Sequence, residues 1–286
     1  MKSIKHGILA LAFCVMALGF APATQAAEDF KGSWTIERSK APGQVHFGLR
    51  HRSDRNNSNF EMDQPKSAFT GLDLETRGKR DVTFAMNRDA GRLDCEGYLN
   101  DGEGAGTFRF TADEKYPASM RTIGFDDIDG PRQFALALHD VSLAFAKQMK
   151  AENLANLDTD KLLAFRIFDV NPQFIREMRA AGMPAKDADK LIAFRVHGVT
   201  PAIVHELRKS HIDANEDQLI AFRVHGVTPD FVQKVGKLGF GSADPDQLVA
   251  MRVHGVTPEY IAGLKSRGVK DLTIDKLVSL KIHGIE

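Results

Sequence analysis

The chain has 286 residues, of which 43% are apolar, enough to bury the cores of two small domains. Its 38 basic and 38 acidic residues balance. This neutrality excludes a bulk electrostatic attraction to nucleic acid or to anionic lipid.

Residues 1–26 are typical of a secretory signal peptide. Lys2 and Lys5 form a positive end, and residues 8–20 form an apolar run. Residues 24–26 place small side chains at the expected cleavage positions. The run is too short for a membrane-spanning helix. We therefore expect a periplasmic or secreted bacterial protein with no transmembrane segment in the mature chain. The mature chain keeps one cysteine, Cys95, which is typical of a small buried residue on a strand.

Residues 27–127 are predicted to form a β domain. Residues 88–91 and 100–102 contain Asp, Asn and Gly, which tolerate positive φ and indicate tight turns. The expected architecture is an antiparallel meander of about five to seven strands, either a small sandwich or an open barrel. Apolar and polar side chains alternate, as in half-buried strands, over residues 33–37, 44–49, 81–86, 92–98 and 106–110.

Two motifs in this half could suggest a ligand. The glycine-rich run 102–106 opens a predicted strand, whereas a phosphate-binding loop must open a helix, so we interpret it as part of a hairpin. The acidic segment 126–130 resembles the start of a calcium loop. Its first and twelfth ligand positions would be Phe125 and Leu136, which cannot coordinate, so we interpret it as a linker.

Residues 128–286 contain an internal repeat. The sequence Arg-Val-His-Gly-Val-Thr-Pro begins at Arg195, Arg223 and Arg252, with a looser copy at Arg166 and a truncated one at Lys281. A repeat interval of 28 or 29 residues is the signature of a helical repeat array. The predicted units lie near residues 130–158, 159–187, 188–215, 216–244 and 245–273, with a partial unit at 274–286.

Each unit is predicted to contain two short helices. Asp244 can cap the first helix, which ends at Gly255, and Thr257 can cap a second helix that begins at Pro258. Helices of about ten residues are marginal in water on their own. We therefore expect the units to stack on one another, and the fold class to be α+β: a β domain followed by an array of two-helix units.

A histidine recurs at one position of the repeat. A shared zinc ion would need two or more imidazoles about 2 Å from the metal, but stacked helices lie about 9–10 Å apart. We therefore predict no metal and no cofactor. Each histidine is expected to serve the free carbonyls of a last helical turn, with ligand contact as the alternative. The row comprises His139, His197, His225, His254 and His283.

An arginine stands two residues before His197, His225 and His254, and Lys281 stands two residues before His283. On a helical wheel, Arg195 falls inside the apolar arc of its helix, so its charge must be paired or extend to solvent. An aspartate recurs at the start of the same helix, and we predict an Arg–Asp ladder between units involving Asp189, Asp217, Asp246 and Asp275. The candidate partner-binding or structural residues are Arg166, Arg195, Arg223, Arg252, His197, His225, His254 and His283.

The pattern Arg-Val-His-Gly-Val-Thr-Pro-Glu-Tyr at 252–260 resembles helical repeats of exported bacterial proteins. Similar repeats form C-terminal extensions of antirepressor-type membrane metallopeptidases. The likeness covers about residues 134–286 and implies a helical array without the peptidase. Such an enzyme needs a His-Glu-x-x-His helix, and the nearest segment, 205–209, has Lys209 at the second ligand position.

The layout is also similar to helix-hairpin-helix DNA-binding modules, in which a Gly-containing turn aims backbone amides at a phosphate. Here the turn is Gly255-Val256-Thr257-Pro258. Thr257 replaces the second glycine of that pattern, and Pro258 lacks an amide. This resemblance makes extracytoplasmic DNA binding an alternative function, with nucleic acid the less favoured partner.

No sequence pattern for nucleophilic or acid–base catalysis emerges. We therefore expect a non-enzymatic, exported scaffold that uses its helical repeat surface to bind a protein or peptide partner in the cell envelope. The third possibility is an enzyme whose active site lies in the β domain.

Overall fold

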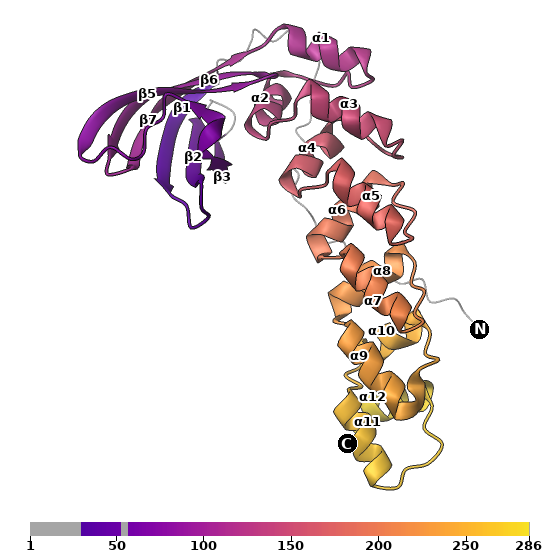
Figure 1. Cartoon of the computed structure of the whole chain (residues 1–286). Coiled ribbons are helices and arrows are strands. Elements are labelled where there is room, and N and C mark those ends of the chain that lie inside the picture. The colour runs from indigo at the N-terminus through magenta and orange to yellow at the C-terminus, as the bar shows by residue number, and fades with distance from the viewer. Residues whose placement is uncertain (1–29, 53–56, 286) are drawn as a thin grey trace.

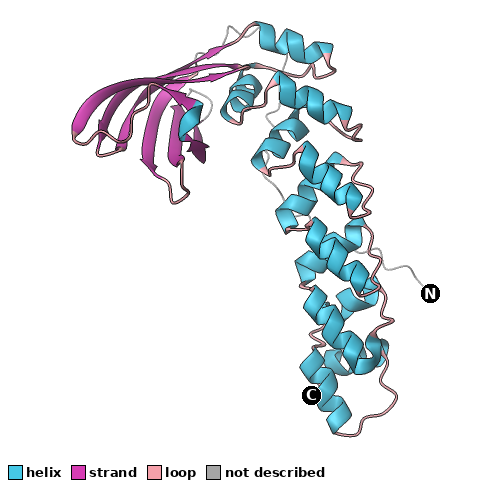
Figure 2. Cartoon of the chain, viewed as in Figure 1, coloured by secondary structure: helices cyan, strands magenta, loops and turns pink. Residues whose placement is uncertain are grey.

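The computed structural model describes residues 30–52 and 57–285, so the predicted signal peptide at 1–26 lies outside the described residues. A curved antiparallel sheet comes first and an elongated column of helices follows (Figures 1 and 2). The predicted α+β class is confirmed. Among the described helices, none is both long enough and apolar enough to cross a membrane.

The sheet is a single half-barrel rather than a sandwich (Figure 1). The predicted antiparallel sheet is confirmed, with one crossover between its edges. The first strand is central and pairs with both the second and the seventh, and the chain crosses from one sheet edge to the other through a short turn at Lys66–Ala68. The order is β3-β2-β1-β7-β6-β5-β4, with β1 Lys31–Arg38, β2 Gln44–Arg52, β3 Asn57–Pro65, β4 Phe69–Thr70, β5 Lys79–Arg88, β6 Gly91–Asn100 and β7 Glu103–Ala112.

Large apolar side chains fill the inside of the curved sheet. Phe47 of β2 and Phe69 of β4 meet edge to face at 5.0 Å, although these strands are not neighbours in the sheet. Trp34 is completely buried and donates from Nε1 to the carbonyl of Glu96 at 3.0 Å. A Cβ at Gly106 would lie 2.7 Å from that nitrogen, so the indole needs glycine beneath it. The interior is therefore packed rather than open.

Helices of two kinds alternate along the column. The first helices of successive units, α4, α6, α8, α10 and α12, contact one another in that order, and the second helices α7, α9 and α11 do the same (Figure 1). The bounds are α1 Lys115–Thr122, α2 Gly130–Leu138, α3 Leu143–Ala151, α4 Thr159–Ile167, α5 Pro172–Ala180, α6 Ala188–His197, α7 Pro201–Lys209, α8 Glu216–His225, α9 Pro229–Val235, α10 Pro245–Val253, α11 Pro258–Ser266 and α12 Ile274–Ile282.

Local signals set the helix boundaries as predicted. Asp244 accepts from the backbone amide of Gln247 and caps α10, while Thr257 accepts from that of Tyr260 and caps α11. Gly255 follows α10 with φ of 72°, the left-handed conformation that ends a helix at little cost.

Two apolar positions of each first helix form the core of the column. Leu191 and Phe194 of α6 are both completely buried, and so is the valine of the turn that follows, Val199. Equivalent residues are buried in the units on either side, including Leu162, Phe165, Val170, Leu219, Phe222, Val227, Leu248, Met251 and Val256. The short helices are thus held by stacking on one another.

Candidate binding surface on the helical column

One apolar position of each first helix points to solvent. The exposed fractions are 49% for Ile167, 38% for Val196, 55% for Val224, 52% for Val253 and 59% for Ile282. One helical turn earlier lies a partly buried apolar residue, on the same helix face. We call this row the apolar stripe: Leu163, Ile167, Ile192, Val196, Ile220, Val224, Val249, Val253, Val278 and Ile282.

The same face of α2 is covered by the β domain. Phe134 and Leu138 occupy the stripe positions there, and each is 1% exposed. The Phe134 ring lies 4.9 Å from Phe30 and 5.1 Å from Phe110, centroid to centroid. Gln64 of β3 donates to the carbonyl of Leu138 at 3.1 Å. The helix face that is open in α4, α6, α8, α10 and α12 is therefore covered by the β domain in α2.

The arginine row runs beside the stripe and joins consecutive units. Arg166 Nε donates to the carbonyl of His139 at 2.9 Å, and Arg223 Nε donates to that of His197 at 3.0 Å. Arg252 bonds the His225 carbonyl in the same way at 3.4 Å. Each arginine thus closes the carbonyl end of the equivalent helix one unit earlier, where cations are favoured.

The predicted Arg–Asp ladder is wrong in its pairing. Asp189 pairs with Lys161 and Asp217 with Lys190, while Asp246 accepts from Gln218 at 3.0 Å. The reason is helix direction. Six residues separate the aspartate from the arginine, about 9 Å along the helix axis, and the stacked first helices run in parallel. Helix starts therefore meet helix starts, and helix ends meet helix ends.

Aromatic rings support the arginine side chains. The Arg195 guanidinium lies 4.0 Å above the Phe174 ring of the preceding unit and also bonds Asp169 at 3.0 Å. Arg166 lies over Phe145 and Arg252 over Phe231, each at 5.1 Å. These contacts explain how a cation is tolerated at the edge of an apolar arc.

Replacing Arg195 by methionine should cost about 1 kcal/mol or less of unfolding free energy, because a partly exposed ion pair is worth little and methionine keeps the contact with Phe174. Arg195→Ala should cost more, since it also removes the packed aliphatic stem. Urea unfolding of both variants tests this. Equal losses would show that the charge, not the stem, stabilises the unit boundary.

The histidine row does not follow its predicted role throughout. Nδ1 of His283 lies 2.7 Å from the carbonyl of Ser279, in the last turn of its own helix. Among the described residues, the rings of His197, His225 and His254 have no such bond, and the arginine row takes the carbonyls of His197 and His225 instead. No group of three or more His, Cys, Asp or Glu within the described chain could hold a metal ion.

His139 differs from the rest of its row because it lies at the boundary with the β domain. Burial, and secondly the positive charge of Arg166, lower the pKa of His139 from its ordinary value of 6.5. The folded protein therefore binds this proton less readily than the unfolded chain, and stability is lost as the pH falls below about 6.5. The loss between pH 7.5 and 5.5 should be smaller in His139→Gln. Urea midpoints at both values test this, and an unchanged loss contradicts it.

The turns between the two helices of a unit already use their amides. Gly198 N–H donates to the carbonyl of Arg195 at 3.2 Å, and Val199 N–H donates to that of Phe194 at 2.7 Å. Gly255 and Val256 repeat these bonds. Because both amides end the preceding helix, neither is available to a phosphate oxygen.

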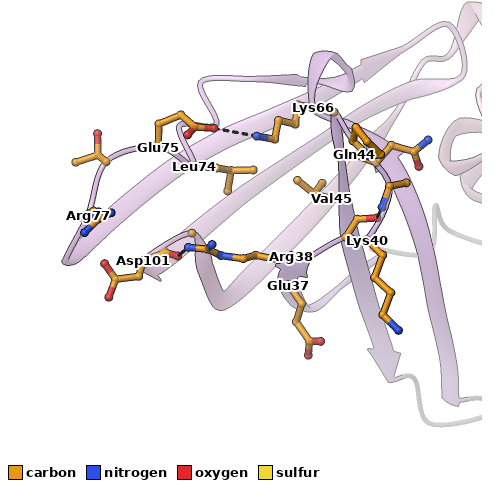
Figure 3. Close-up of a pocket in the computed structure, with 16 residues that line it drawn as sticks. Glu37, Arg38, Lys40, Gln44, Val45, Lys66, Leu74, Glu75, Arg77 and Asp101 are labelled. Atoms are coloured by element: carbon orange, nitrogen blue, oxygen red, sulfur yellow. Dashed lines mark hydrogen bonds and ion pairs between the residues drawn. The ribbon is translucent and has the colours of Figure 1, made fainter.

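A hollow of about 660 Å³ lies at one end of the half-barrel, lined by residues 37–45, 74–77 and 101–102 together with Lys66 (Figure 3). Lys66 and Glu75 form an ion pair at 2.9 Å across it, and Arg38 donates to the carbonyl of Asp101 at 2.9 Å (Figure 3). These contacts tie the loops together over a packed core. Neither histidine nor cysteine occurs among the described residues that line it.

Comparison of the chain with protein-family models, with curated proteins and with solved structures found no match.

Proposed function

We propose that this protein is an exported, non-enzymatic scaffold whose apolar stripe binds a protein or peptide partner in the cell envelope. The observation that carries the proposal is the contrast within one chain. At one repeat position Leu138 is buried beneath the β domain, while the five later copies, from Ile167 to Ile282, are open. A face that already forms one interface is chemically suited to form another.

The arrangement of the stripe supports this use. Isolated exposed apolar residues are ordinary on protein surfaces, but contiguous rows of them mark interaction sites. Here the row crosses α4, α6, α8, α10 and α12, which stack side by side. Stacked repeats create extended surfaces of the kind that bind long partners.

DNA binding through the Gly-Val-Thr-Pro turns is the less favoured alternative. The amides of Gly198 and Val199 are already bonded, and the sequence carries no excess of positive charge. A filter-binding assay across a salt series separates the two functions. Phosphate contacts would give affinity that falls steeply with salt, whereas the scaffold proposal expects no binding even at low salt.

Photo-crosslinking in intact cells tests the proposal. A photo-reactive amino acid replaces Val224 in one variant and Ala202, exposed on the second helix α7, in a matched control. We expect a defined covalent adduct with another protein from position 224 and none from position 202. The adduct should disappear when Val196 and Val253 are also changed to serine. Equal adducts from both faces, or none from position 224, would overturn the proposal.

A further inference from the structure

We infer that the part of the apolar stripe on α8 and α10, called the lower units below, binds an extended acidic peptide in polyproline II conformation. The carboxylate and apolar side chains of this peptide each recur every third residue. The inference rests on the proposed function and names the chemistry of its partner. It draws on three features of the column: the charge beside the stripe, the position of that charge on the helix, and the spacing of the layers.

The charge beside the stripe changes along the column. After α2 and α4 the turn residue is aspartate, Asp140 or Asp169, and it pairs with the arginine of the next unit at 2.7 Å or 3.0 Å. After α6 and α8 that residue is glycine, Gly198 or Gly226. The next arginines, Arg223 and Arg252, have no carboxylate partner among the described residues and bond only main-chain carbonyls. The lower units thus present cations that the upper units neutralise.

These cations lie next to the stripe. Arg223 and Val224 are adjacent, about 100° apart on the helix, and both are exposed. The next unit repeats the adjacent pair with Arg252, which is half-buried, and Val253, which is exposed. The acidic row at the helix starts is about 10 Å away along the axis, and its Asp217 is already paired with Lys190. A ligand lying on Val224 and Val253 is therefore beside the cations and away from the carboxylates.

The spacing of the layers selects the ligand backbone. Packed helices lie about 8–10 Å apart, so equivalent side chains recur at that interval. A polyproline II chain has three residues per turn and rises about 3.1 Å per residue, so every third side chain returns to the same face after about 9.3 Å. In a β-strand, residues three apart point to opposite faces. Only the first geometry gives each layer the same contact.

The interface on α2 indicates why apolar groups accompany the carboxylates. There the stripe position is occupied by Phe134 and Leu138, which are buried against aromatic rings and one side-chain amide, with no charge on the stripe itself. The stripe residues of the lower units are also uncharged. They provide the apolar half of the site, while Arg223 and Arg252 provide the ionic half.

Fluorescence anisotropy with synthetic peptides tests this inference on the full mature chain. The probe is a labelled (Pro-Glu-Leu)4 peptide, compared with (Pro-Gln-Leu)4, (Pro-Lys-Leu)4 and (Glu-Leu)6. The last peptide keeps the length and the one-to-one ratio of glutamate to leucine, carries more charge, and has a period of two. We expect the glutamate probe to bind about tenfold more tightly than each of the others and to weaken between about 50 mM and 200 mM salt.

Two double variants locate the site. Arg223→Gln with Arg252→Gln, and separately Val224→Ser with Val253→Ser, should each weaken binding of the probe about tenfold. The second pair removes only exposed side chains, so it keeps the test valid if the first pair disturbs the column. Lys234→Gln with Lys237→Gln changes exposed cations outside the row and should leave affinity unchanged. Circular dichroism checks that each variant is folded.

Equal binding of the glutamate and lysine peptides, equal binding of (Glu-Leu)6, or no binding of the probe at about 1 mM would overturn the inference. The proposed function can hold even if this inference fails, because photo-crosslinking tests it independently. If photo-crosslinking at position 224 captures a protein but the glutamate probe does not bind, the stripe is a docking surface whose partner has a different chemistry.

Discussion

Replacing Phe222 by alanine is expected to lower the free energy of unfolding by about 3–5 kcal/mol, because the ring is 1% exposed and leaves a cavity between stacked units. Each unit gains its stability from its neighbours, so the loss should spread to the adjoining units rather than stay within α8. Urea unfolding followed by far-ultraviolet circular dichroism measures the change. The helical signal should begin to fall at lower urea than in the wild type.

Val224 on the same helix provides the matched control. It is two residues away and is exposed, so Val224→Ala should change the unfolding free energy by about 0.5 kcal/mol or less. Similar losses at the two positions would mean that the exposed valine belongs to the core, and the apolar stripe would then not be a free surface. A large loss at Phe222 alone supports both the stacking and the orientation of α8.

Phe134→Ala is the second large change. The ring lies in a cluster with Phe30, Phe60, Phe108 and Phe110, and its removal should cost about 3–5 kcal/mol at the contact between α2 and the β domain. We expect the variant to uncouple the two halves of the chain. The sheet and the column would then unfold in separate transitions rather than in one.

Two probes distinguish these outcomes. Trp34 is the only tryptophan and lies in the sheet core, so its fluorescence reports the β domain, while circular dichroism reports mainly the helices. The two transitions should coincide in the wild type and separate in Phe134→Ala. Leu163→Ala, at the equivalent but partly exposed position of α4, should keep them together. Coincident transitions in Phe134→Ala would show that this ring does not join the halves.

Much of the helical half could be predicted because its signals are local. A cap such as Asp244, a proline at a helix start and a glycine such as Gly255 act within a few residues, so the sequence displays them directly. The strands of the β domain and their order were harder to predict. The edge strand β3 carries only Phe60 and Met62 as apolar residues, and β4 has two residues, so neither shows a clear alternation. The pairing of β1 with β7 depends on long-range topology.

The candidate site was only partly visible in the sequence for a similar reason. The arginine positions could be found from the repeat, but their partners could not, because the pairing depends on the parallel stacking of helices from different units. The exposed valines are apolar like the core residues, so residue type alone does not distinguish the two groups. The available signal was angular: Val196 lies 140° from the buried Leu191, far enough to face solvent, and the repeat places an apolar residue there each time.

The most direct test of the apolar stripe as an occupied surface is thiol labelling, which compares purified protein with intact cells. Cys95 is buried, and that burial raises the pKa of its thiol, so it should not compete for a maleimide. Val224→Cys and Val253→Cys should react readily in the purified protein and about tenfold more slowly in cells, where the partner covers them. Ala262→Cys, exposed on α11, should react alike in both. Equal protection at all three positions, or none at Val224 and Val253, would contradict the account.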